Sequence, residues 1–180
     1  MKITIIQCCD SVDSNDFLSI LTEQGFYEAD VLISKLNSIK PDKIFCSPFL
    51  RTLQTIYPYS IESGKYINID YALLPIHKVD MNDKSTLFLN YNKNSYDFFE
   101  YITSIINDEY KSSIYSNNIK IKERKIDIKN RICTFLYDVC KSYENTKKNI
   151  ALVVDVDIIP FITQYFNSLT RSTIEVIELK

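Results

Sequence analysis

The stretch LTEQGFYEADVLISKLNSIKPDKIFCSPFLRTLQT, residues 21–55, indicates the fold class. Thr22 is a typical N-cap residue, and apolar side chains follow it at helical spacing from Ala29 to Leu36. A proline ends that helix, and Lys43–Cys46 is then a short buried strand, followed at once by the start of another helix. Helices that alternate with short buried strands predict an α/β fold with a mostly parallel sheet.

The rest of the chain continues this alternation, and no linker or internal repeat divides it. We therefore expect one domain over residues 1–180 and a three-layer α/β/α sandwich. The region 57–95, with its prolines and a glycine, is expected to be irregular apart from a weak strand at Tyr66–Ile69. The other predicted strands are Ile3–Ile6, Ile150–Val154 and Thr173–Leu179. The first two of these are expected beside Lys43–Cys46 at the centre of the sheet. The other predicted helices are 96–107, 126–143 and one after Ile158.

Composition excludes several classes of function. A formal net charge of -2 and a pI near 5.5 give no general attraction to nucleic acid or to anionic membranes, so neither is expected as a partner. The five cysteines have no zinc-site spacing, which favours reduced thiols. No run approaches the roughly 20 apolar residues of a membrane span, and the N-terminal apolar run is too short for a signal peptide. These features predict a soluble intracellular protein, cytoplasmic or nuclear.

The position of a functional pocket follows from the predicted sheet. In open parallel sheets, sites form outside the carboxyl ends of the strands. The residues that follow these ends are Gln7, Cys8, Cys9 and Asp10 after the first strand, Ser47 and Pro48 after the second, and Asp155, Val156 and Asp157 after the strand at 150–154.

Several of these segments resemble the histidine phosphatase superfamily, which has the phosphoglycerate mutase-like fold. That family reads strand-RHG, then LTxxGxxQA, then a strand ending in SPxxRxxQT. DYALLP (70–75), IDIKNRICTFL (126–136) and STIEVIEL (172–179) resemble further family segments, so the likeness covers nearly the whole chain. The residues that match the two longer patterns are Leu21, Thr22, Gly25, Ala29, Ser47, Pro48, Arg51, Gln54 and Thr55.

The resemblance also shows where the chain departs from the family. Gln7-Cys8-Cys9 stands in place of RHG, Pro75 in place of the catalytic acid and Val156 in place of the second histidine, while Arg51 is kept. The family mechanism needs an imidazole nucleophile, cations around the phosphoryl group and a proton donor. We therefore expect no catalytic residue and no cofactor, and predict an inactive pseudoenzyme that serves as a structural or protein-interaction subunit. Its unidentified protein partner would bind the aromatic segment from Tyr57 to Tyr96.

Three alternatives remain open beside that prediction, and the oligomeric state is not predicted. Cys8 could replace the nucleophile, although a buried, inert thiol is favoured. Asp10, Asp155 and Asp157 could assist an altered phosphatase by holding a divalent cation, although solvated or capping carboxylates are favoured. Arg51 could bind a phosphorylated ligand, although an ion pair with one of these aspartates is favoured.

Overall fold

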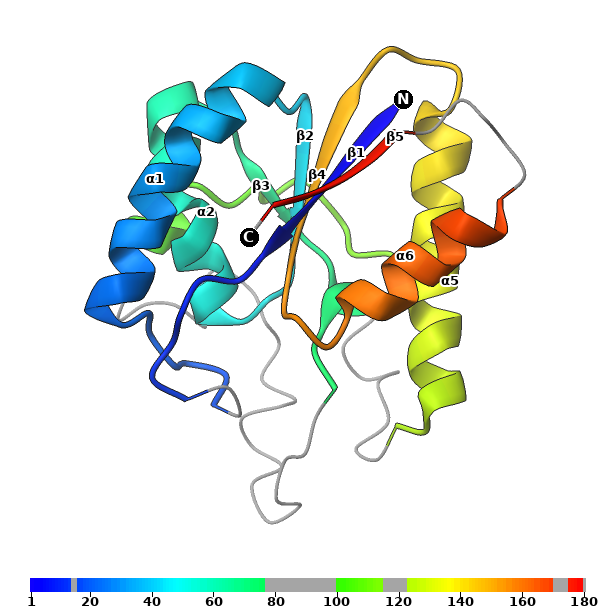
Figure 1. The fold of residues 1–180 in the computed structure, drawn as a ribbon, viewed down its shortest axis with the longest axis horizontal. Coiled ribbons are helices and arrows are strands. Elements are labelled where there is room, and N and C mark those ends of the chain that lie inside the picture. Colours follow the sequence, from blue (N-terminus) through cyan, green and yellow to red (C-terminus); the bar gives the residue numbers. More distant parts are fainter. Residues whose placement is uncertain (14–15, 77–99, 115–122, 170–174, 180) are drawn as a thin grey trace.

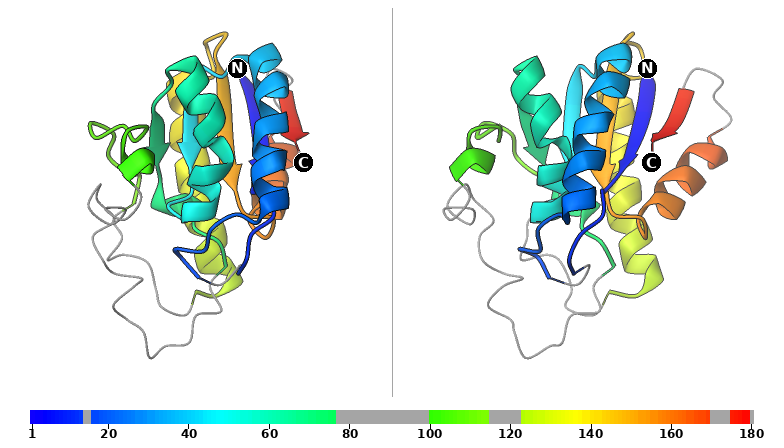
Figure 2. Two further views of the ribbon diagram at one scale, coloured as in Figure 1. Left: turned by 90° about the vertical axis from the view of Figure 1, so that its left-hand side faces the viewer. Right: turned by 60° about the vertical axis from the view of Figure 1, so that its left-hand side comes forward.

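The computed structural model describes residues 1–13, 16–76, 100–114, 123–169 and 175–179, and it has the predicted α/β architecture. A five-stranded sheet with the order β3-β2-β4-β1-β5 forms the middle layer. Helices α1 and α2 cover one face, and α5 and α6 cover the other (Figure 1). Figure 2 shows the same separation of the two helix pairs from two further directions. The fold prediction is confirmed.

The strands are β1 (Lys2–Gln7), β2 (Lys43–Cys46), β3 (Ile67–Ile69), β4 (Asn149–Val154) and β5 (Glu175–Leu179). Every pairing among them is parallel. The register puts Ile150 beside Ile3 of β1 on one side and beside Lys43 of β2 on the other. The three strands predicted to be central are therefore adjacent, and their carboxyl ends lie at one edge of the sheet.

The first face of the sheet is covered by α1 (Glu23–Ile39) and α2 (Leu50–Ser63). The Thr22 hydroxyl caps α1 by accepting a hydrogen bond from the Gly25 backbone amide at 3.0 Å. Gly25 has no room for a side chain, because an added Cβ would lie 2.0 Å from the backbone oxygen of Asp10. The helix and the loop after β1 therefore pack backbone against backbone, which fixes where that loop runs.

The second face is covered by α5 (Lys125–Tyr143) and α6 (Ile159–Ser168). The strands that contribute here are β1, β2 and β4, whose side chains alternate between the two faces. Phe45 of β2 packs edge-on against Phe135 of α5, with ring centroids 5.4 Å apart. Two short elements complete the described chain, η1 (Tyr71–Leu73) and α4 (Glu100–Thr103).

Two element predictions need correction. Helix α2 continues through Pro58 to Ser63, although residues 57–95 were expected to be irregular. Pro58 removes one helical hydrogen bond, but the buried turn around it, which includes Tyr59, supplies packing that keeps the helix intact. Gly64, in the left-handed conformation with φ of 66°, then ends it. The helix expected over 96–107 is described only as the single turn of α4.

Residues 77–99 and 170–174 lie outside the described part of the chain. Much of the predicted partner segment from Tyr57 to Tyr96 and the first residues of the predicted strand 173–179 fall there. Among the helices that the structure describes, none is both long enough and apolar enough to cross a bilayer.

Candidate functional site

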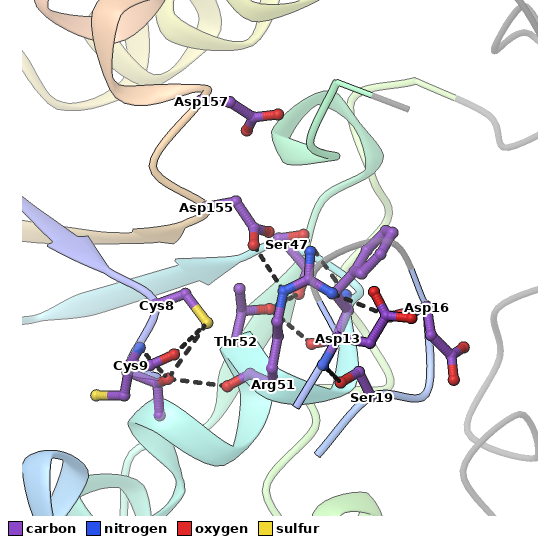
Figure 3. Close-up of polar contacts among 12 residues, drawn as sticks. Cys8, Cys9, Asp13, Asp16, Ser19, Ser47, Arg51, Thr52, Asp155 and Asp157 are labelled. Carbon is purple, nitrogen blue, oxygen red and sulfur yellow. Dashed lines mark hydrogen bonds and ion pairs between the residues drawn. The ribbon is translucent and has the colours of Figure 1, made fainter. Parts of the chain in front are cut away.

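A cleft of about 400 Å³ opens at the carboxyl ends of β1 and β4, where the parallel sheet predicts a site. It contains most of the positions singled out from the sequence, and Figure 3 shows its polar contacts. Arg51 of α2 and Glu28 of α1 complete its lining. The lining residues are Gln7, Cys8, Cys9, Asp10, Ser11, Glu28, Arg51, Asp155 and Val156.

Arg51 is the cation of this cleft, and it is only 1% exposed. Its Nε donates a hydrogen bond to Oδ1 of Asp155 at 2.7 Å, and its Nη1 donates to the backbone oxygen of Asp16 at 2.9 Å. The guanidinium carbon lies 4.3 Å from the centre of the Phe49 ring, a cation–π contact. The ion pair expected from the sequence therefore exists, and its carboxylate partner is Asp155 (Figure 3).

Asp155, directly after β4, is the acidic member of the pair. Its Oδ1 is engaged by Arg51, whereas its Oδ2 is buried and has no hydrogen-bond partner within the described structure. Burial raises the pKa of the Asp155 carboxyl, and the charge of Arg51 opposes that rise. Asp155 therefore has one buried oxygen without a partner in the described structure, and it accepts a proton more readily than an exposed aspartate does.

Cys8 follows β1 and lies in the same cleft. Its backbone amide donates to the Val154 oxygen at 2.8 Å, which ties the loop to β4. Its Sγ lies 3.2 Å from the Cys9 backbone oxygen and 3.8 Å from the Thr55 hydroxyl oxygen. Burial raises the pKa of the Cys8 thiol well above its usual value, and the negative charge of Asp155 raises it further. The thiol is therefore protonated at neutral pH and needs a base before it can attack.

The other two candidate carboxylates have structural partners. Oδ2 of Asp10 accepts a hydrogen bond from the Thr22 hydroxyl at 2.7 Å, and Oδ2 of Asp157 accepts one from the Ile76 amide at 2.8 Å. Burial raises the pKa of Asp157, which also has one unpartnered buried oxygen, Oδ1. Within the described ranges, no group of three or more histidine, cysteine, aspartate or glutamate side chains is arranged to hold a metal ion.

Four of the predicted positions lie outside the lining of the cleft: Ser47, Pro48, Pro75 and Asp157. The Pro75 backbone oxygen accepts a hydrogen bond from Arg131 of α5 at 3.4 Å. Sequence reasoning missed Glu28, which lines the cleft and accepts a hydrogen bond from the Asp10 amide at 3.2 Å. The position of Glu28 just before Ala29 is the glutamine position of LTxxGxxQA, so the family pattern held a signal for it.

In three-layer α/β proteins, ligand sites form at the carboxyl edge of the parallel sheet, and in this chain a buried arginine lies at that edge. The model of the histidine phosphatase superfamily (branch 1) matches residues 14–180. The chain belongs to this superfamily.

Solved structures agree with the family assignment at the level of the fold. A mycobacterial glucosyl-3-phosphoglycerate phosphatase with inorganic phosphate has a TM-score of 0.60 and 14% identity, over 92% of this chain and 78% of that one. An ecdysone phosphate phosphatase from Bombix mori with tungstate has a TM-score of 0.65 and 12% identity, over 87% and 60%. A phosphoserine phosphatase mutant from Entamoeba histolytica with phosphoserine has a TM-score of 0.57 and 15% identity, over 94% and 81%. Among curated proteins, none matches the chain significantly.

These findings correct the functional prediction. The sequence was interpreted as that of an inactive pseudoenzyme, not an enzyme, with a structural or protein-interaction role. The family match and the solved structures, which are described as phosphatases, instead point to phosphatase function. The prediction was wrong because it treated the replaced positions as lost chemistry and kept the phosphatase with altered chemistry, based on Cys8 or on Asp155 and Asp157, only as an alternative.

Proposed function

We propose that this protein is a phosphatase that hydrolyses a phosphate monoester in the cleft around Arg51. The observation that supports the proposal most directly is that the buried Arg51 and Asp155 and the partly buried Cys8 line one cleft at the edge of the sheet. A guanidinium presents a planar set of donors that matches the oxygens of a phosphate, and it stays charged when buried.

Phosphate binding at Arg51 requires a change in the ion pair with Asp155. A phosphate dianion and an ionised carboxylate repel each other when both face the same guanidinium. Because burial already raises the pKa of Asp155, a bound phosphate favours the protonated form of this carboxyl. Arg51 can then turn its donors to the phosphate, and the proton that Asp155 takes up comes from the thiol of Cys8.

Cys8 is our candidate for the nucleophile, because the family resemblance aligns it with the histidine of RHG and it faces the same cleft as Asp155. The single histidine of the chain, His77, lies outside the described residues. In the proposed reaction, Oδ2 of Asp155 accepts the Cys8 proton, and the thiolate attacks phosphorus while the bond from phosphorus to the ester oxygen breaks. The leaving oxygen takes the proton back from Asp155. Water then hydrolyses the phosphocysteine, which releases inorganic phosphate and restores the thiol.

The test is steady-state hydrolysis of p-nitrophenyl phosphate, with and without magnesium, by the wild type and single variants. Cys8→Ser is expected to lose at least about a hundredfold in kcat, since removal of a nucleophile costs up to about 10⁶ in an unrelated hydrolase. Cys133→Ser is the matched control, because this half-buried thiol on α5 lies outside the cleft. Wild-type turnover no faster than the protein-free blank would refute the proposed function.

A further inference from the structure

A second cavity, of about 300 Å³, lies between the end of β1 and helix α1. Four of its residues, Gln7, Cys8, Cys9 and Glu28, also line the Arg51 cleft, so the two spaces adjoin at the candidate nucleophile. The rest of its wall comes from one side of α1, at Tyr27, Val31, Leu32 and Lys35. We call this second cavity the α1 groove.

The α1 groove is walled mainly by apolar side chains that are not fully covered. Tyr27 is 65% exposed and Val31 is 43% exposed, although both lie on a helix whose outer positions would ordinarily be polar. Leu32 is buried, and Lys35 lies about two turns of α1 beyond Glu28. A ligand in this groove would exchange contact with water for contact with an aromatic and two aliphatic side chains.

At the junction with the cleft, the groove has a negative charge. The carboxylate of Glu28 is held there by hydrogen bonds from the Asp10 amide and from the side-chain amide of Gln24. Asp155 adds a second carboxylate on the cleft side. Substrate groups that carry further negative charge close to the ester bond would be repelled by these carboxylates.

We infer that the α1 groove binds the leaving group of the phosphate ester and selects an uncharged aromatic or bulky aliphatic one. The inference rests on the proposed function, because it assumes that the phosphoryl group lies between Arg51 and Cys8. From there, the groove is an adjoining space with an apolar wall, and its volume suits one or two rings. The substrate class is therefore a hydrophobic phosphate monoester, in contrast to the phosphate ester of a polyanionic acid.

The first experiment compares kcat/KM for 1-naphthyl phosphate and for glycerol 2-phosphate. The variants Val31→Asp and Tyr27→Ser change the groove and leave Arg51, Cys8 and Asp155 untouched. Their matched controls are Ile61→Asp on α2 and Tyr66→Ser, which are 53% and 64% exposed and lie outside both cavities. We expect wild type to prefer the naphthyl ester at least about tenfold, the range that an apolar pocket gives for a small change in hydrophobic contact. Val31→Asp should abolish most of this preference, and the controls should keep it.

A second experiment measures the dissociation constant of 1-naphthyl phosphate by NMR titration. It uses Cys8→Ser protein, which is expected to bind the ester without hydrolysing it. It separates the inference from the proposed function. If wild type hydrolyses neither ester, the proposed function is overturned, and the inference then depends on binding alone. Weaker binding in the Val31→Asp background than in the Ile61→Asp background supports the groove as the binding site. Equal binding in both, or equal kcat/KM for both esters, overturns the inference.

Discussion

Replacing Arg51 with methionine tests the energetics of the buried ion pair most directly. The side chain of Arg51 is 1% exposed and that of Asp155 is 11% exposed, so the pair is shielded from water. Removing one partner of a buried pair costs roughly 3–5 kcal/mol, because the remaining charge is left without compensation. For a chain of this length, that loss lowers the melting temperature by about 10 °C. Methionine keeps much of the arginine volume, so the change isolates the charge.

The cost of Arg51→Met should depend on pH in a defined direction. Without Arg51, nothing opposes the rise in the pKa of Asp155 that burial produces, so the folded pKa moves further above the unfolded value. A group of this kind contributes stability below its unfolded pKa and loses that contribution as pH rises through its folded pKa. The variant should therefore be close to wild type at about pH 4, near the unfolded pKa of aspartate, and clearly weaker at neutral pH.

The measurement is urea unfolding at several pH values for wild type, Arg51→Met, Asp155→Asn and the double variant. Adding Asp155→Asn to Arg51→Met should restore stability at neutral pH, because the uncompensated carboxylate is gone. The double-mutant cycle should give a coupling of roughly 2 kcal/mol or more. A loss below about 1 kcal/mol for Arg51→Met, of the size seen for exposed pairs, would refute the reasoning.

Three further predictions concern other parts of the chain. Gly25→Ala should destabilise the protein by about 1–3 kcal/mol in urea unfolding, because the new Cβ would overlap the Asp10 carbonyl, and a neutral result would show that the loop after β1 can move. Asp70→Asn should cost about 1–3 kcal/mol in thermal unfolding, because this fully buried carboxylate accepts hydrogen bonds from four donors. Asn68→Asp, two residues earlier in the sequence and also buried, serves as the comparison for an added charge. In timed alkylation followed by mass spectrometry, Cys133 should react before Cys46, since Cys46 is fully buried and burial raises the pKa of its thiol; the reverse order would contradict the structure.

The fold was predictable because each local signal in the sequence agreed with its tertiary setting. Thr22 caps α1 as its side chain suggests, and the apolar run at 150–154 is the central strand β4. Pro58 is the exception. Its local preference is to end a helix, but the buried face of α2 on both sides of it outweighs that preference, and a single sequence does not show which of the two prevails.

The position of the site was predictable from the sequence, but the pairing of its side chains and the groove beside it were not. The rule for carboxyl ends of parallel strands placed Cys8 and Asp155 in one cleft, and the structure brings them there. Which aspartate pairs with Arg51 was not predictable, because Asp10 and Asp157 also follow strand ends and differ from Asp155 only in where their loops turn. The α1 groove was also missed, because the sequence places the apolar Tyr27 and Val31 off the buried face of the helix but does not show whether another segment of the chain covers them.

The strand order has a consequence for how the chain folds. Strands β1 and β2 do not touch each other in the sheet; β4 lies between them, although it comes more than a hundred residues after β2 begins. Residues 1–148 on their own would leave the facing edges of both strands without hydrogen bonds. The chain loses the conformational entropy of a long loop before it gains the hydrogen bonds of such a strand pairing. Sheets of this connectivity therefore form slowly. During synthesis, the molecule should therefore remain an open, association-prone intermediate until β4 leaves the ribosome and inserts between β1 and β2. The insertion of β4 is then the step that completes the native sheet.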